Sequence, residues 1–141
     1  MDCTDLRDDR KGESAPVGEK PVRVLAAVSD LIFLSKISAA ARQAGCPLEF
    51  FRQAEKLKEA IPGDPCIVIV DLNNTGIDPV ALIAELKAAP KTDHAQVIAY
   101  LSHVHHELKR EAEKAGADLV LPRSVFSQNL YDLLRQHSCH L

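Results

Sequence analysis

Five apolar residues run directly into an acid in the stretch Cys66-Ile67-Val68-Ile69-Val70-Asp71. An uninterrupted apolar run of this length predicts a strand covered on both faces, because a half-exposed strand would alternate apolar and polar residues. A short polar loop follows, and Asp78-Pro79 then predicts the start of a helix, with the acid as N-cap and the proline as its first residue. A buried strand that leads into a helix is the repeating unit of a parallel sheet.

The same alternation of strand and helix extends in both directions from this stretch. Each helix is recognised by apolar residues at helical spacing, and Gly45 and Gly116 are stop signals for two of them. Five strand–helix units in succession predict a parallel sheet with helices on both sides. The expected segments are strand 22–28, helix 31–44 (Leu34, Ile37, Ala41, Ala44), strand 48–51, helix 52–60, strand 66–70, a helix from 79 (Val80, Ile83, Ala84), strand 97–101, a helix with Val104, Leu108, Ala112 and Ala115, strand 119–121, and a last helix capped by Ser124 (Phe126, Leu130, Leu133, Leu134).

The length of 141 residues fits one domain, and 46% hydrophobic residues suffice for a core. Residues 1–20 differ from the rest because half of them are charged and few are apolar, so we expect a disordered charged tail. The predicted organisation is a tail over 1–20, one domain over 21–138, and a short C-terminal tail over 139–141.

Composition argues against several classes of function. A net charge of −3 and the lack of a basic run argue against a nucleic-acid binder. No apolar stretch is long enough for a membrane span, and no signal peptide begins the chain, so the expected location is the cytoplasm. Cys3, Cys46, Cys66 and Cys139 are then expected to be free thiols. The sequence also has no glycine-rich phosphate loop and no serine-hydrolase elbow, so it gives no support for nucleotide binding or acyl hydrolysis.

Chemistry in a parallel α/β sheet takes place at the carboxyl ends of the strands. The residues that follow the strands here include Asp30, Asp71, Ser102 and Arg123. Carboxylates suit Mg²⁺, and a metal opposite a cationic side chain can stabilise a phosphoryl group in transfer. For Asp30, helix capping is as strong an interpretation as metal binding, since this residue can cap the helix that begins at Leu31.

From about Val22 to Leu134 the chain resembles the receiver domains of bacterial response regulators. The order of elements, the acid after the third strand and the acid–proline pair after its loop all match. The run Ala115-Gly116-Ala117-Asp118-Leu119-Val120-Leu121 is similar to the stretch before the family's lysine. The resemblance implies a flavodoxin-like (βα)₅ three-layer sandwich with strand order 2-1-3-4-5.

The resemblance also implies roles for residues. Asp71 is the phospho-acceptor, and Mg²⁺ is held by Asp30, Asp71 and the main-chain carbonyl of Asn73. Ser102 contacts the phosphoryl oxygens, or Leu101 occupies that position by a strict count. Arg123 stands at the lysine position.

Several positions depart from the family pattern. Ser29 replaces one acid of the usual pair, which weakens the expected Mg²⁺ site. Arginine at 123 is bulkier and forked, so it does not simply replace a lysine. Thr75 replaces a loop proline, Val120 replaces the switching aromatic, and Pro122 precedes the cation where the family has a proline after it.

Two functions from different classes follow. The first is a stand-alone response regulator in a phosphorelay, phosphorylated at Asp71 by a histidine kinase or phosphotransfer protein, with no enzymatic activity beyond self-phosphorylation from a phosphodonor. Its phosphorylated form shifts a conformational equilibrium at the fourth and fifth elements, contacts a downstream protein and can form a homodimer. The alternative is a phosphorylation-independent pseudo-receiver that docks partners constitutively. A minor alternative, from Val70-Asp71-Leu72-Asn73, is a STAS-like anti-sigma-factor antagonist.

Two histidine-containing clusters fit no closed four-ligand metal pattern, so we interpret them as surface clusters. His103 alone is expected at the active edge, where a contact with Asp71 or a phosphoryl group is a second hypothesis. The clusters are His103, His105 and His106, and His137, Cys139 and His140.

Overall fold

The computed structural model describes residues 22–102 and 106–138 and contains one parallel five-stranded sheet with the strand order β2-β1-β3-β4-β5. This order confirms the predicted flavodoxin-like topology. The elements are β1 (Arg23–Ala27), α1 (Leu31–Ala44), β2 (Leu48–Phe50), α2 (Ala54–Ala60), β3 (Cys66–Asp71), α3 (Pro79–Ala88), β4 (Gln96–Leu101), α4 (His106–Ala115), β5 (Leu119–Pro122), α5 (Arg123–Gln128) and α6 (Leu130–Ser138).

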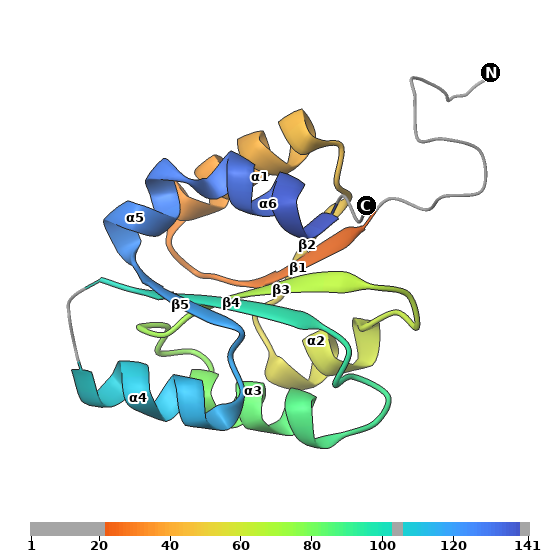
Figure 1. Cartoon of the computed structure of the whole chain (residues 1–141), viewed down its shortest axis with the longest axis vertical. Coiled ribbons are helices and arrows are strands. Elements are labelled where there is room, and N and C mark those ends of the chain that lie inside the picture. The colour runs from red at the N-terminus through yellow and green to blue at the C-terminus, as the bar shows by residue number, and fades with distance from the viewer. Residues whose placement is uncertain (1–21, 103–105, 139–141) are drawn as a thin grey trace.

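The sheet lies between two helical layers (Figure 1). Helices α1, α5 and α6 cover one face, and α2, α3 and α4 cover the other. All six residues of β3 are buried, as expected for a strand covered on both faces. Alternate residues of β3 therefore enter different cores: Ile67 and Ile69 pack under α1 and α6, whereas Val68 and Val70 pack over α3.

The register of the strands brings the functional segments to one edge of the sheet. Asp71 at the end of β3 is paired with Tyr100 of β4, and Leu101 of β4 is paired with Pro122 of β5. The carboxyl ends of these three strands, together with the loop after β1, lie on the left in Figure 1. The sheet thus places Asp71, Ser102 and Arg123 at neighbouring strand ends.

The predicted start of one helix and the predicted end of another are confirmed. Asp78 caps α3 by accepting a hydrogen bond from the Ala81 backbone N–H (3.2 Å), and Pro79 is the first helical residue. Gly45 ends α1 with a left-handed φ of +76°, as its position in the sequence predicts.

The last predicted helix was wrong in two respects. It begins at Arg123 and not after Ser124, with Pro122 as an N-cap that makes no side-chain bond. It is also divided at Asn129, whose side chain donates to the Val125 carbonyl oxygen (2.8 Å) and so competes with the helical backbone. The apolar residues of both halves still face the core, because Phe126, Leu130, Leu133 and Leu134 are all buried.

One predicted helical face was also misplaced. Ala84 of α3 is exposed, and the buried residues of this helix are Leu82, Ile83 and Leu86. Leucine at 82 and 86 offers more apolar area than alanine, so the helix is rotated to bury the larger side chains.

Some expectations lie outside the described residues. They are the predicted tails over 1–20 and 139–141, the thiols of Cys3 and Cys139, the core position Val104, and the histidines at 103, 105 and 140. Cys46 and Cys66 are described and both are buried; Cys66 is a free thiol, as predicted. None of the helices in the described part of the chain combines the length and apolar character needed to cross a bilayer.

Candidate functional site

Asp71 is a buried carboxylate at the end of β3, with 8% of its surface exposed. Its Oδ1 atom accepts a hydrogen bond from the Asn73 backbone N–H (2.9 Å), while no described residue donates to Oδ2. Burial raises the pKa of Asp71, with a smaller contribution in the same direction from Asp30. The Asn73 N–H and the Arg123 guanidinium oppose this rise. Asp71 therefore has one oxygen held in place and one oxygen available for chemistry.

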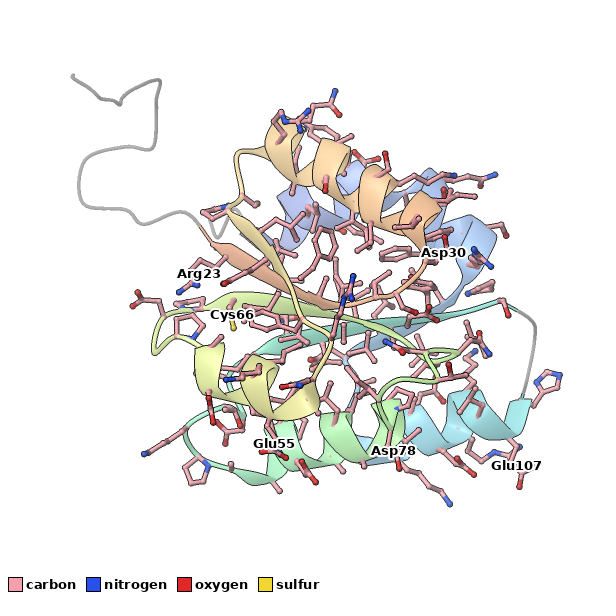
Figure 2. The ribbon with its side chains drawn as sticks, turned by 180° about the vertical axis from the view of Figure 1, so that it is seen from behind. Arg23, Asp30, Glu55, Cys66, Asp78 and Glu107 are labelled. Carbon is pink, nitrogen blue, oxygen red and sulfur yellow. The ribbon has the colours of Figure 1, made fainter. Side chains whose placement is uncertain are left out.

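Asp30 lies at the beginning of α1, on the side next to α5 (Figure 2). Its Oδ1 atom caps the helix by accepting from the backbone N–H groups of Ile32 (2.8 Å) and Phe33 (3.4 Å). Its Oδ2 atom accepts a hydrogen bond from the Arg123 guanidinium, so the two side chains form an ion pair. The capping interpretation is confirmed, and both carboxylate oxygens are engaged.

Arg123 is the first residue of α5 and is oriented by two contacts. Its guanidinium pairs with Asp30 and also lies over the Phe33 ring, 4.6 Å from the ring centroid. The same guanidinium favours the charged form of Asp71. Arg123 thus lies where it interacts with both carboxylates, and its hydrogen bond goes to Asp30.

Asn73 joins the loop after β3 to the end of β4. Its side-chain Oδ1 accepts from the Ser102 backbone N–H (2.6 Å). This bond fixes Ser102 at the edge while its hydroxyl is engaged by no described residue. Leu101 is buried in the core on the α3 side, so Ser102 is the residue of the two that supplies a polar side chain here.

Asn74 is a structural residue of the site that sequence reasoning missed. It is 8% exposed; its Nδ2 donates to the Ala27 carbonyl oxygen (3.2 Å), and its Oδ1 accepts from the Gly76 N–H (2.8 Å). The side chain anchors the loop after Asp71 to the end of β1. An asparagine in a loop predicts a local turn, but the partner on β1 is visible only in the fold.

Tyr100 was also missed, although it lies directly beside Asp71 in the sheet. Its ring stacks on both Phe33 (4.9 Å between ring centroids) and Phe126 (4.6 Å), which are 6.1 Å from each other, and 1% of the residue is exposed. Its hydroxyl has no hydrogen-bond partner among the described residues. Burial strongly raises the pKa of Tyr100, and the charges of Asp71 and Asp30 add to the rise. The phenol is neutral at any physiological pH.

The predicted magnesium ligands come together only in part. The described residues contain no group of three histidine, cysteine or acidic side chains that could hold a metal ion. The oxygens of Asp30 are already bound by the helix and by Arg123, whereas Asp71 keeps Oδ2 for a cation. Oxygen donors fit Mg²⁺, and a site based on one available carboxylate needs additional ligands from carbonyls and water.

No model of a known protein family matches the sequence, and a comparison with curated proteins finds no relative. The structure is, however, similar to solved structures of response regulators. The response regulator RPA3017 of R. palustris red-light signalling has a TM-score of 0.66 and 20% identity, covering 79% of this chain and 90% of its own. The phosphorylated cyanobacterial phytochrome response regulator RcpA has a TM-score of 0.67 and 12% identity, and the match covers 83% of this chain and 91% of RcpA. The Mn²⁺-bound response regulator Rcp1 has a TM-score of 0.65 and 13% identity, and the match covers 82% of this chain and 91% of Rcp1.

These likenesses show that the chain has the receiver-domain fold, as the sequence predicted. Because the parallel order 2-1-3-4-5 also agrees with this fold, the STAS-like alternative has no support from the structure. Identities of 12–20% show the fold alone, so the activity must be argued from Asp71 and its neighbours.

Proposed function

We propose that the chain is a response-regulator receiver in which Asp71 accepts a phosphoryl group from a histidine kinase or phosphotransfer protein. The observation that carries the proposal is the geometry of Asp71, at the end of the central strand, with Oδ1 fixed by the Asn73 N–H and Oδ2 available. The chain shares its fold with RcpA, a response regulator whose structure is of the phosphorylated form, and this likeness supports the proposal. The module acts through protein contacts and is itself no enzyme beyond self-phosphorylation.

The reaction is a simple displacement on phosphorus. An Asp71 carboxylate oxygen attacks the phosphorus of the donor, a P–O bond to Asp71 forms, and the bond to the donor's leaving group breaks with its electron pair. Asp71 must be ionised to attack, which the Asn73 N–H and Arg123 favour against the cost of burial. A divalent cation, when bound by Asp71 and the Asn73 carbonyl, would neutralise charge on the transferring group. The Ser102 hydroxyl, at the neighbouring strand end, would donate to a phosphoryl oxygen.

Arg123 gives this receiver a distinctive arrangement. Its present partner is Asp30, and a phosphoryl group on Asp71 would offer a dianion with up to three acceptor oxygens. Because a guanidinium prefers bidentate pairing with such an anion, we expect Arg123 to leave Asp30 upon phosphorylation. The exchange would loosen a contact between α1 and α5 and so convey phosphorylation to that face.

The Asp30–Arg123 ion pair also favours the second candidate, a constitutive pseudo-receiver. Both groups already have a partner in the unmodified chain, and the pair occupies an acid that the expected metal site needs. In this alternative the paired edge is a permanent structural feature, and the α4–α5 face docks a partner without phosphorylation.

The two candidates differ in one experiment. The purified protein is incubated with acetyl phosphate and Mg²⁺, and its intact mass is measured under conditions that preserve acyl phosphates. We expect one added phosphoryl group in the parent chain and none in Asp71→Asn. Asp93→Asn, which changes an exposed acid in the loop before β4, is the matched control and should be modified like the parent. An unmodified parent chain, with no Mg²⁺ binding, would support the pseudo-receiver instead.

A further inference from the structure

A groove of about 740 Å³ lies between α1 and α5, beside the phospho-acceptor edge. Cationic, hydroxyl and amide side chains line most of it, and none of the described residues that line it is acidic. This size is in the range of small-molecule sites, well above the volume of a single ion. The lining residues are Phe33, Lys36, Ser102, Pro122, Arg123, Ser124, Ser127 and Gln128.

Lys36 supplies the charge of this groove. It projects from the exposed face of α1, and its Nζ donates to the Ser127 hydroxyl oxygen of α5 (3.0 Å) while lying 5.5 Å from the centroid of the Phe33 ring. None of the described acids forms an ion pair with Lys36. An ammonium has three N–H donors, so two remain for a ligand after the bond to Ser127.

The hydroxyls add directional donors. Because the Ser127 oxygen accepts from Lys36, its own proton is oriented away from the ammonium and can be donated to an anion. Ser102 and Ser124 line the same groove with hydroxyls that no described residue engages. Arg123 closes one end, with one nitrogen on Asp30 and further N–H donors in its fork.

We propose that this groove binds a phosphate monoester, whose phosphoryl head contacts Lys36, Ser127 and Arg123. Two cations and several hydroxyl donors match a dianion with three acceptor oxygens. The remaining volume, bordered by Phe33 and Pro122, accommodates the organic part of the ester. The groove shares Ser102 and Arg123 with the phospho-acceptor edge, whereas Lys36 and Ser127 belong to the groove alone.

The test is a titration of the full-length chain with phenyl phosphate in the absence of divalent cations, followed by backbone amide NMR shifts. We expect saturable shifts at Lys36, Ser124 and Ser127, and tighter binding at pH 7 than at pH 5, because the ester becomes a dianion above a pKa of about 6. Inorganic phosphate should bind more weakly than the ester. Equal affinities would overturn the assignment of an ester.

Variants locate the site. Lys36→Met should weaken binding about ten-fold or more through the loss of a charge-assisted hydrogen bond, and Lys36→Arg should restore most of it. Lys91→Met removes an exposed lysine from the loop before β4 and is the matched control, with no expected change. Equal losses in Lys36→Met and Lys91→Met, or no saturable shift in the parent chain, would overturn the proposal.

Discussion

Asp71 is subject to opposing influences at the scale of a single residue. Burial favours its neutral form, whereas the Asn73 N–H and Arg123 favour its charged form, and the net result is a raised pKa. A carboxyl group with a raised pKa retains its proton to higher pH in the folded protein than in the unfolded chain. The free energy of unfolding therefore falls as pH rises through the interval between the two pKa values.

Removing this charge should stabilise the protein. We expect Asp71→Asn to raise the free energy of unfolding at pH 7 by on the order of 1 kcal/mol, and the gain should vanish as the pH falls toward about 4, where the unfolded carboxyl is also protonated. Urea unfolding from pH 4 to pH 8 measures the difference. Asp93→Asn is the control. A stability gain that is the same at every pH would show that ionisation of Asp71 is not its cause.

Tyr100 presents the opposite case, a neutral polar group in the core. Its hydroxyl is buried without a hydrogen-bond partner among the described residues, which costs stability. Tyr100→Phe should therefore raise the free energy of unfolding, by about 1 kcal/mol, because it removes an unsatisfied group and keeps the stacked ring. Tyr131→Phe, in a partly exposed residue, is the control and should be near neutral. A clear loss of stability in Tyr100→Phe would reveal a bond to the hydroxyl.

At the scale of elements, the end of the sheet opposite the site is held by one polar network. Lys87 of α3 donates to the Ala95 carbonyl (2.6 Å) and to Asp118 (2.9 Å), and Asp118 also accepts from the Val97 N–H (2.7 Å). The network joins α3, β4 and the turn before β5. The close passage of Lys87 requires a residue without a side chain at Gly116, where an added Cβ would lie 2.7 Å from the Lys87 Cγ.

Gly116→Ala should therefore be destabilising. Its φ of +115° is unfavourable for any residue with a Cβ, at a cost of about 1–3 kcal/mol, and the contact with Lys87 adds to it. Gly63→Ala is the matched control, because nothing lies within 4 Å of its added Cβ; its effect should stay within about 0.5 kcal/mol. Thermal unfolding of the two variants compares them directly, and equal stabilities would contradict the role given to Gly116.

The sequence predicts elements well where a single local signal decides them. The apolar run of β3 and the Asp78-Pro79 start of α3 are of this kind, and both are confirmed. The end of helix α5 is not decided by such a signal. The side chain of Asn129 bonds the Val125 carbonyl oxygen there, and the apolar periodicity of the sequence does not reveal this bond.

The candidate site likewise has features that local signals predict and features that depend on tertiary packing. Strand ends predict that Asp71, Ser102 and Arg123 share one edge, since parallel strands end together. Partners depend on tertiary packing: the pairing of Arg123 with Asp30, the anchor of Asn74 on Ala27 and the position of Tyr100 beside Asp71 all join segments distant in sequence. The phospho-acceptor role of Asp71 and the metal ligands stay predictions.

At the scale of the whole molecule, the candidate site lies at the carboxyl edge of the sheet, where neighbouring strands end together. One cation, Arg123, lies between the helix-capping acid Asp30 and the buried acid Asp71. A change at Asp71 can therefore be transmitted to α1 and α5 without movement of the strands. We propose that signalling by this molecule depends on the exchange of partners by Arg123.

Beryllofluoride, a stable mimic of a phosphoryl group on aspartate, tests that claim most directly. The parent chain is titrated with beryllofluoride and Mg²⁺ while backbone amide and arginine side-chain NMR signals are recorded, with Asp71→Asn as the control. We predict that signals of Asn73, Ser102 and the Arg123 guanidinium shift together with the helix-capping amides of Ile32 and Phe33, because Arg123 exchanges Asp30 for the new anion. Unchanged spectra at saturating beryllofluoride, or shifts identical in Asp71→Asn, would contradict it.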